Sequence, residues 1–141
     1  MPEKQTVERA RRDRRQGKAP STQAGEFVHE EIEHIREGKH GARSTKQAIA
    51  IGLSKARRAG VPLPAPSKGT VPERTRRSAA RAYEVGQGRR KPRAPSARRG
   101  RAVERALERE GSSAASRPAL RAQAKRAART RRKRGERSAT G

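Results

Sequence analysis

This chain of 141 residues has no cysteine and no tryptophan, and it has one phenylalanine and one tyrosine. Without cysteine, disulfides, thiolate nucleophiles and cysteine-ligated metal sites are excluded, and nothing indicates an oxidising compartment. Recognition of single-stranded RNA usually depends on aromatic side chains that stack on bases. Only Phe27 and Tyr83 could stack, and Phe27 falls in an apolar stripe, so that kind of recognition is disfavoured.

Large apolar residues are also scarce. Leu, Ile, Val and Phe together number 15, well below the level typical of a globular domain. Burial of so few side chains cannot offset chain entropy over the whole length, so most of the chain is expected to be disordered when free. No apolar run approaches the ~20 residues of a membrane span, and the first residues lack the apolar stretch of a secretory signal. We therefore expect no membrane partner, with the cytoplasm or the nucleoid as the default location.

Positive charge is what the chain has in excess, with 38 Lys and Arg against 14 Asp and Glu and a net charge of +24. Residues 61–141 hold 24 of these cations and only six Glu, for a net +18, whereas residues 1–60 carry the remaining +6. Lys and Arg that neutralise nucleic-acid phosphates release condensed counterions, which favours binding. Nucleic acid is the predicted partner, with duplex DNA favoured over RNA.

Start and stop signals for helices predict a mainly α fold: a small helical hairpin with largely disordered, helix-prone basic N- and C-terminal arms. The predicted parts are a basic N-terminal arm (1–20), the helical hairpin (21–60), a Pro-rich linker (61–71) and a basic Ala/Arg-rich tail (72–141). In the N-terminal arm, residues 6–16 are expected to form an exposed helix capped by Thr6 and ended by Gly17. In the tail, three blocks are helix-prone and are each expected to end at a glycine: 72–85, 96–110 and 118–134.

The first hairpin helix is expected to be capped by Ser21 or Thr22 and closed by Gly38. Its apolar stripe contains Ala24, Phe27, Val28, Ile32 and Ile35, and the opposite stripe contains Glu26, Glu30, Glu33 and Glu37. Glu31 lies near the apolar side and is expected to pair with a cation. The acidic stripe is interpreted as a solvated face or as a docking surface for basic segments, and it should face away from DNA.

The second hairpin helix has the clearest boundaries. Ser44 and Gln47 fit a capping box, in which each side chain satisfies a backbone N–H of the other residue. At the far end, Gly60 fits the left-handed position after a helix and Val61 the apolar contact that accompanies it. A hairpin of about 40 residues is marginal alone. We therefore expect stabilisation by DNA or by a homodimer formed through the hairpin.

Catalytic and metal-binding patterns are weak. His29 and His34 flank acidic residues, but they are five apart, whereas the H-E-x-x-H motif of zinc proteases needs four. The glutamate stripe has no accompanying nucleophile and little apolar surface from which to build a pocket. The sequence therefore predicts a protein that is not an enzyme and has no cofactor and no metal site.

The candidate nucleic-acid-binding residues are cations from four segments. Arg99-Gly100-Arg101 has the centre of an AT-hook but lacks the proline that follows it, so an extended arm around Lys91 is the better candidate for tracking a groove or phosphates. The full set is Arg57, Arg58, Arg89, Arg90, Lys91, Arg93, Arg98, Arg99, Arg101, Lys125, Arg126, Arg129, Arg131, Arg132, Lys133 and Arg134.

Residues 46–60 read KQAIAIGLSKARRAG and follow a Glu37-Gly38-Lys39 connector. This segment resembles the K-Q-A-I-A-I-[AG]-L-S-[EK]-A-[RG] signature of a family of small basic bacterial proteins, over about 35 residues. Names attached to that family include DNA-binding, histone-like and plasmid-stabilisation protein. The resemblance implies DNA association without supplying individual binding residues.

These observations predict a non-enzymatic, largely sequence-independent DNA-binding protein of the nucleoid or of a plasmid, which acts through phosphate neutralisation. Two alternatives stay open. One is an RNA- or ribosome-associated basic protein. The other is a protein-interaction accessory of plasmid maintenance, with the hairpin as the partner site.

Overall fold

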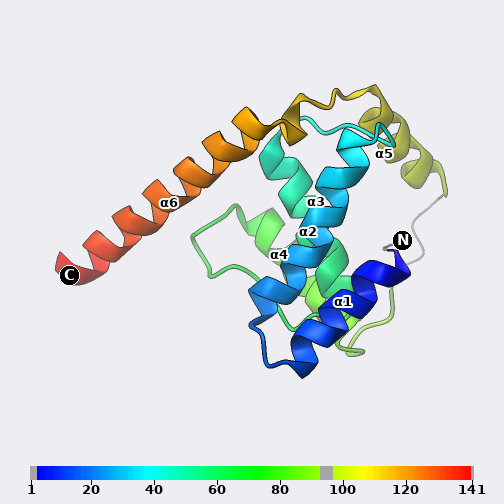
Figure 1. Ribbon diagram of the computed structural model, residues 1–141. Coiled ribbons are helices and arrows are strands. Elements are labelled where there is room, and N and C mark those ends of the chain that lie inside the picture. The colour runs from blue at the N-terminus through cyan, green and yellow to red at the C-terminus, as the bar shows by residue number, and fades with distance from the viewer. Residues whose placement is uncertain (1–2, 93–96, 141) are drawn as a thin grey trace.

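The computed structural model describes residues 3–92 and 97–140, with side-chain positions for residues 3–92 and 97–135 (Figure 1). Helices account for all the regular secondary structure in these ranges, and no strand is present there. The elements are α1 (Lys4–Arg15), α2 (Pro20–Arg36), α3 (Thr45–Arg58), α4 (Glu73–Gly86), α5 (Ala97–Arg109), the short 3-10 helix η1 (Ser113–Ala115) and α6 (Arg117–Thr140). The prediction of a mainly α protein is confirmed.

Helices α2 and α3 lie against each other, as the hairpin prediction requires, but they do not form a separate unit. Helix α1 packs on α2, and α4 packs on α3 (Figure 1). The first core cluster joins three of these helices and the segment after α3: Ala10, Ala24, Phe27, Ala56 and Val61 are buried in it. Small residues at most of these positions let the helices approach closely, so a core forms from few large side chains.

The N-terminal helix is packed rather than exposed, and here the prediction is wrong. Helix α1 begins after Glu3, and Thr6 is fully buried instead of capping it. The Thr6 hydroxyl donates to Glu30 Oε1 at 3.0 Å, and the Glu3 backbone N–H donates to the same oxygen at 2.7 Å. These polar contacts, the buried Ala10 and the contact of Val7 with the first core cluster hold α1 against α2, although its sequence has no large core-forming stripe.

Helix α2 starts two or three residues earlier than predicted, because Pro20 occupies its first turn and its N-cap is Ala19 rather than Ser21 or Thr22. Proline suits this position, since its backbone nitrogen has no hydrogen to leave unpaired and its φ is already helical. The predicted end is confirmed: Gly38 has a φ of +79°, and its N–H donates to the Ile35 carbonyl at 3.1 Å.

Helix α3 has the predicted cap with one difference. The Ser44 hydroxyl accepts from the Gln47 N–H at 3.1 Å, but Gln47 Oε1 accepts from the Arg43 N–H at 2.6 Å rather than from Ser44. At the far end Gly60 has a φ of +103°, and Val61 is buried and donates its N–H to Ala56 at 3.1 Å. The signals at both ends of α3 thus predicted its span correctly.

Gly52 is where α2 and α3 approach most closely. A Cβ added there would lie 2.6 Å from the Val28 Cα and 2.9 Å from the Val28 backbone nitrogen, whereas a Cβ added at Gly25 would meet nothing within 4 Å. Backbone atoms cannot move aside as a flexible side chain can, so the two helices would have to separate.

We expect Gly52→Ala to lower the free energy of unfolding, because overpacking costs about 1–3 kcal/mol and outweighs the gain of about 1 kcal/mol in helix propensity. Gly25→Ala is the matched control and should raise the free energy of unfolding by about 1 kcal/mol. Urea unfolding followed by far-ultraviolet circular dichroism measures both. Shifts of the same sign in the two variants would contradict the close packing of α2 on α3.

Helix α4, the first helix of the basic tail, packs on α3, and the four helices α1, α2, α3 and α4 are together called the body below. Ala79 and Ala82 of α4 are buried, and a Cβ added at Gly86 would lie 1.7 Å from the Arg57 carbonyl oxygen. Gly86 was predicted to terminate this helix, but it lies in the last turn, and the left-handed glycine is Gly88 with a φ of +75°. Gly86 therefore serves close packing rather than helix termination.

Residues between α5 and α6 return to the end of the hairpin at which α2 is connected to α3. Ala114 and Ala115 are buried there in a second cluster with Ile35, Ala42 and Ala48. The backbone is held by hydrogen bonds from Arg36 Nε to the Ala115 carbonyl at 3.1 Å and from the Thr45 hydroxyl to the Ala114 carbonyl. This anchor fixes the starting point of α6 on the body.

Beyond the anchor, α6 leaves the bundle as a single long helix (Figure 1). Only its first turns lie near α3 and η1, and it continues through Gly135, where the sequence predicted an end. In the described part of the chain, no helix combines the length and the apolarity needed to cross a bilayer.

Candidate nucleic-acid interface

Two adjacent arginines at the end of α3 have opposite environments. Arg57 is only 7% exposed, and its guanidinium donates to the carbonyls of Leu63 and Pro64, both at 3.1 Å. Burial lowers the pKa of Arg57 below its ordinary value. Arg58 is exposed. Arg57 therefore holds the Pro-rich segment against α3, which corrects its prediction as a phosphate ligand, whereas Arg58 is available to phosphate.

The neighbouring pair gives a matched test. Arg57→Gln should lower the free energy of unfolding by about 1.5–3 kcal/mol, because two carbonyls lose a charged donor, and should leave the salt dependence of DNA binding unchanged. Arg58→Gln should change stability by less than about 0.5 kcal/mol and make the slope of log affinity against log salt shallower by about 0.9. Denaturant unfolding and DNA titrations at several salt concentrations measure these effects. If Arg57→Gln changed the salt slope and Arg58→Gln lowered stability, the structural role of Arg57 and the phosphate-binding role of Arg58 would be contradicted.

The basic segment after α4 is exposed but partly engaged with the body. Arg89 lies over the Tyr83 ring, 6.0 Å from its centroid, and Arg90 Nε is 3.6 Å from Glu84 Oε2. Lys91 is exposed. Arg93 lies outside the described residues. These contacts are on the surface and weak, so the cations can exchange them for phosphate.

Helix α5 contains three more of the predicted cations, and Arg98, Arg99 and Arg101 are all exposed on it. The AT-hook geometry needs extended backbone in the minor groove, whereas Arg99-Gly100-Arg101 is helical here. In this conformation Arg99 and Arg101 lie on nearly opposite sides of the helix, and the segment cannot lie in a narrow groove.

Helix α6 carries the largest set of predicted cations. All of them are exposed: Lys125, Arg126, Arg129, Arg131, Arg132, Lys133 and Arg134. At 100° per residue, Lys125, Arg126 and Arg131 point roughly 100–140° apart around the axis. The Arg126 side chain donates to its helical neighbour Gln123 at 3.2 Å. The helix is therefore a rod with positive charge on every side.

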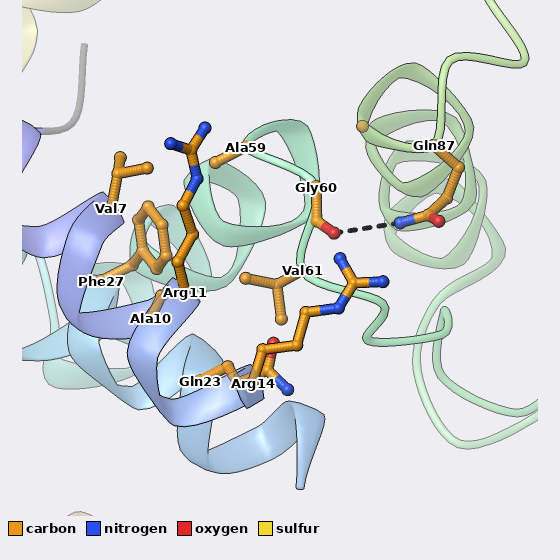
Figure 2. Close-up of a pocket in the computed structure, with 11 residues that line it drawn as sticks. Val7, Ala10, Arg11, Arg14, Gln23, Phe27, Ala59, Gly60, Val61 and Gln87 are labelled. Atoms are coloured by element: carbon orange, nitrogen blue, oxygen red, sulfur yellow. Dashed lines mark hydrogen bonds between the residues drawn. The ribbon is translucent and has the colours of Figure 1, made fainter. Parts of the chain in front are cut away.

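A pocket of about 280 Å³ is lined by α1, α2, the segment after α3 and the end of α4. Val7, Phe27 and Val61 contribute apolar lining, and Arg11 and Arg14 extend over it from α1 (Figure 2). Gln87 of the segment after α4 donates to the Gly60 carbonyl at 3.2 Å on the opposite wall.

Neither arginine of the pocket was among the predicted site residues. Both are exposed, and the i, i+3, i+4, i+7 spacing of Val7, Ala10, Arg11 and Arg14 places them on the packed side of α1. That spacing was the available signal, but α1 was expected to have no packed side. The pocket adds two cations on the body to those of the tail.

Much of the acidic side of α2 is engaged by other groups of the same chain. Arg9 Nε is 3.3 Å from Glu26 Oε2, and Glu30 receives the start of α1. Glu31 is fully buried and pairs with Lys55, as the expected cation, and with His40 at 3.1 Å. The stripe was interpreted either as a solvated face or as a docking surface for basic segments. Glu26 and Glu30 fit the second interpretation, because both contact the N-terminal segment of the same chain.

Comparison with known proteins adds no family to this geometry: no protein-family model, curated protein or solved structure matches the chain. The resemblance of residues 46–60 to small basic bacterial proteins therefore stays a prediction.

Proposed function

We propose that this chain is a non-enzymatic protein that binds duplex DNA largely without regard to sequence, through phosphate neutralisation. The observation that carries the proposal is the projecting helix α6, with exposed cations on all sides, in a chain whose net charge is +24. Nucleic acid is the abundant polyanion whose binding such a surface favours through counterion release. The nucleoid or a plasmid would be its place of action.

The body supports this role because acidic residues of α2 are paired within the chain while several arginines stay exposed. Arg9 of α1 and Lys55 of α3 pair with acidic residues of α2, so little uncompensated negative charge is left to repel DNA. Arg58, Arg11 and Arg14 stay exposed and add to the cations of the tail. The apolar stripe proposed for a homodimer is covered within the chain by α1 and by residues 114–115, so monomeric binding is the simpler form of the proposal.

The proposal is tested by salt titration of the full chain with a 30-base-pair duplex, in parallel with a structured RNA of equal charge. We expect a slope of log affinity against log salt on the order of −6 to −8, little dependence on base sequence, and duplex DNA as the winner in competition at equal salt. A shallow slope would overturn phosphate neutralisation. Preference for the RNA would instead favour the ribosome-associated alternative.

The helical tail is proposed to depend on its partner. Like charges along α6 destabilise an isolated helix, and α6 has little packing of its own beyond the first turns, so phosphate should stabilise it. Far-ultraviolet circular dichroism should therefore show a gain of helix when duplex DNA is added to the free chain. An unchanged spectrum at saturation would contradict folding coupled to binding.

A further inference from the structure

We propose a Zn²⁺ site between the start of α1 and the middle of α2, formed by Glu3, Glu30 and His34. These residues each offer one ligand atom, and the atoms all lie within 4.8 Å of one another. Glu3 Oε1 and His34 Nε2 are 3.2 Å apart, close to the roughly 3.3 Å between neighbouring ligands in a tetrahedral site with 2.0–2.1 Å bonds.

Of these three residues, Glu30 gives the clearest indication of a bound cation. It is 4% exposed, and its Oε1 accepts from two neutral donors, the Glu3 N–H and the Thr6 hydroxyl. Its other oxygen, Oε2, is buried and has no hydrogen-bond partner. A buried carboxylate without a compensating charge is costly, and a divalent cation on Oε2 would remove that cost.

The same contacts prepare Glu30 to bind. A ligating carboxylate is commonly oriented by hydrogen bonds to its second oxygen, and here Oε1 is fixed by Thr6 and by the backbone of Glu3. One imidazole nitrogen with two carboxylate oxygens is a set that suits Zn²⁺, whereas Mg²⁺ prefers oxygen ligands and water.

A second group, made of Glu31, His34 and His40, shares His34 with the first and is a weaker candidate although its ligand atoms are equally close. Glu31 is already paired with Lys55. Both ring nitrogens of His40 are engaged, Nδ1 with the Gly41 carbonyl at 2.9 Å and Nε2 with Glu31 at 3.1 Å. In the first group Glu3 is also engaged, with His34 at 3.2 Å and with Lys39 at 3.6 Å. Of the two groups, however, only the first has a buried carboxylate oxygen without a hydrogen-bond partner, so the site is assigned to the group that contains Glu30.

A metal at this position would connect α1 to α2, which are otherwise joined by a small core around Ala10 and Phe27. Small domains often gain stability from a structural metal, because the folded chain binds it and the unfolded chain does not. The site also fixes α1, and with it Arg11 and Arg14 at the pocket.

The test uses the full chain, melted with Zn²⁺, with Mg²⁺ or with a chelator while far-ultraviolet circular dichroism is recorded. At about a hundredfold excess over Kd, Zn²⁺ should raise the melting midpoint by about 5–15 °C, and the same concentration of Mg²⁺ should not. Absence of a Zn²⁺ effect in the unsubstituted chain overturns the proposal.

Variants locate the site. Glu30→Gln and His34→Gln should each abolish the Zn²⁺ shift, whereas His29→Gln, at an exposed histidine of the same helix, should retain it. Visible absorption of bound Co²⁺, used in place of Zn²⁺, reports ligation directly even where a substitution weakens the fold. The assignment would be overturned if His29→Gln lost the Co²⁺ absorption as fully as Glu30→Gln and His34→Gln. It would also be overturned if His40→Gln lost the absorption and Glu30→Gln kept it.

Discussion

A chain that ends at Ser116, without α6, is expected to bind duplex DNA on the order of a thousandfold more weakly at about 0.1 M salt. Residues 117–141 contain ten Lys and Arg and one Glu. If about four of these cations contact phosphate, their loss should make the slope of log affinity against log salt shallower by about 3–4. Fluorescence anisotropy of a labelled duplex at five or six salt concentrations measures both quantities. The shortened chain keeps the residues 114–115 that close the second cluster, so its thermal midpoint should change little.

A full-length control separates charge from chain length. Replacement of Arg126, Arg129, Arg131 and Arg132 by Lys keeps the charge of α6 and should leave the salt slope within about 1 of the original. Replacement of the same four residues by Gln should reproduce most of the loss caused by the truncation. Full binding strength in the Gln variant would show that the body, and not α6, is the principal DNA-binding element.

Replacement of Phe27 by Ala should have the largest effect on stability, lowering the free energy of unfolding by about 3–5 kcal/mol. Phe27 is 1% exposed and is the largest side chain of the cluster that joins α1, α2 and α3. Its small neighbours Ala10 and Ala56 cannot fill the space that it leaves. A body with so few large apolar residues should be mostly unfolded after this change, which urea unfolding and circular dichroism would show.

The exposed Val103 of α5, 59% accessible, provides the matched control, since Val103→Ala should leave stability nearly unchanged. DNA binding at low salt should persist in Phe27→Ala, because the cations of α6 do not depend on the core. Loss of most low-salt affinity in this variant alone would mean that the folded body presents the main DNA-binding surface.

The parts of the fold that were predictable from sequence are those specified by local signals. Gly38 and Gly60 gave the ends of α2 and α3 correctly because a left-handed residue after a helix is a local requirement. Glu31 was expected to pair with a cation because its position on the apolar side of α2 demanded one. Lys55 supplies that charge from a helix 24 residues away.

The parts that were missed depend on contacts between distant segments. Helix α1 packs through Thr6, Val7 and Ala10, and one large apolar residue does not make an apolar stripe, so the spacing of Val7 and Ala10 was not recognised as a buried face. Arg57 was assigned to phosphate because its charge is visible in the sequence, while the carbonyls of Leu63 and Pro64 that bind it are not. Of the candidate site, the sequence indicated which segments were cationic but not which arginines face inward.

The charge distribution around α6 also bears on recognition. A helix that reads base sequence must present one fixed set of side chains to the groove, which requires a defined rotation about its own axis. In α6 the cations point in all directions, so many rotations about the axis place a similar number of charges next to the phosphates. This rotational degeneracy lowers the orientational cost of binding, and it deprives the helix of a face with which one base pair could be told from another.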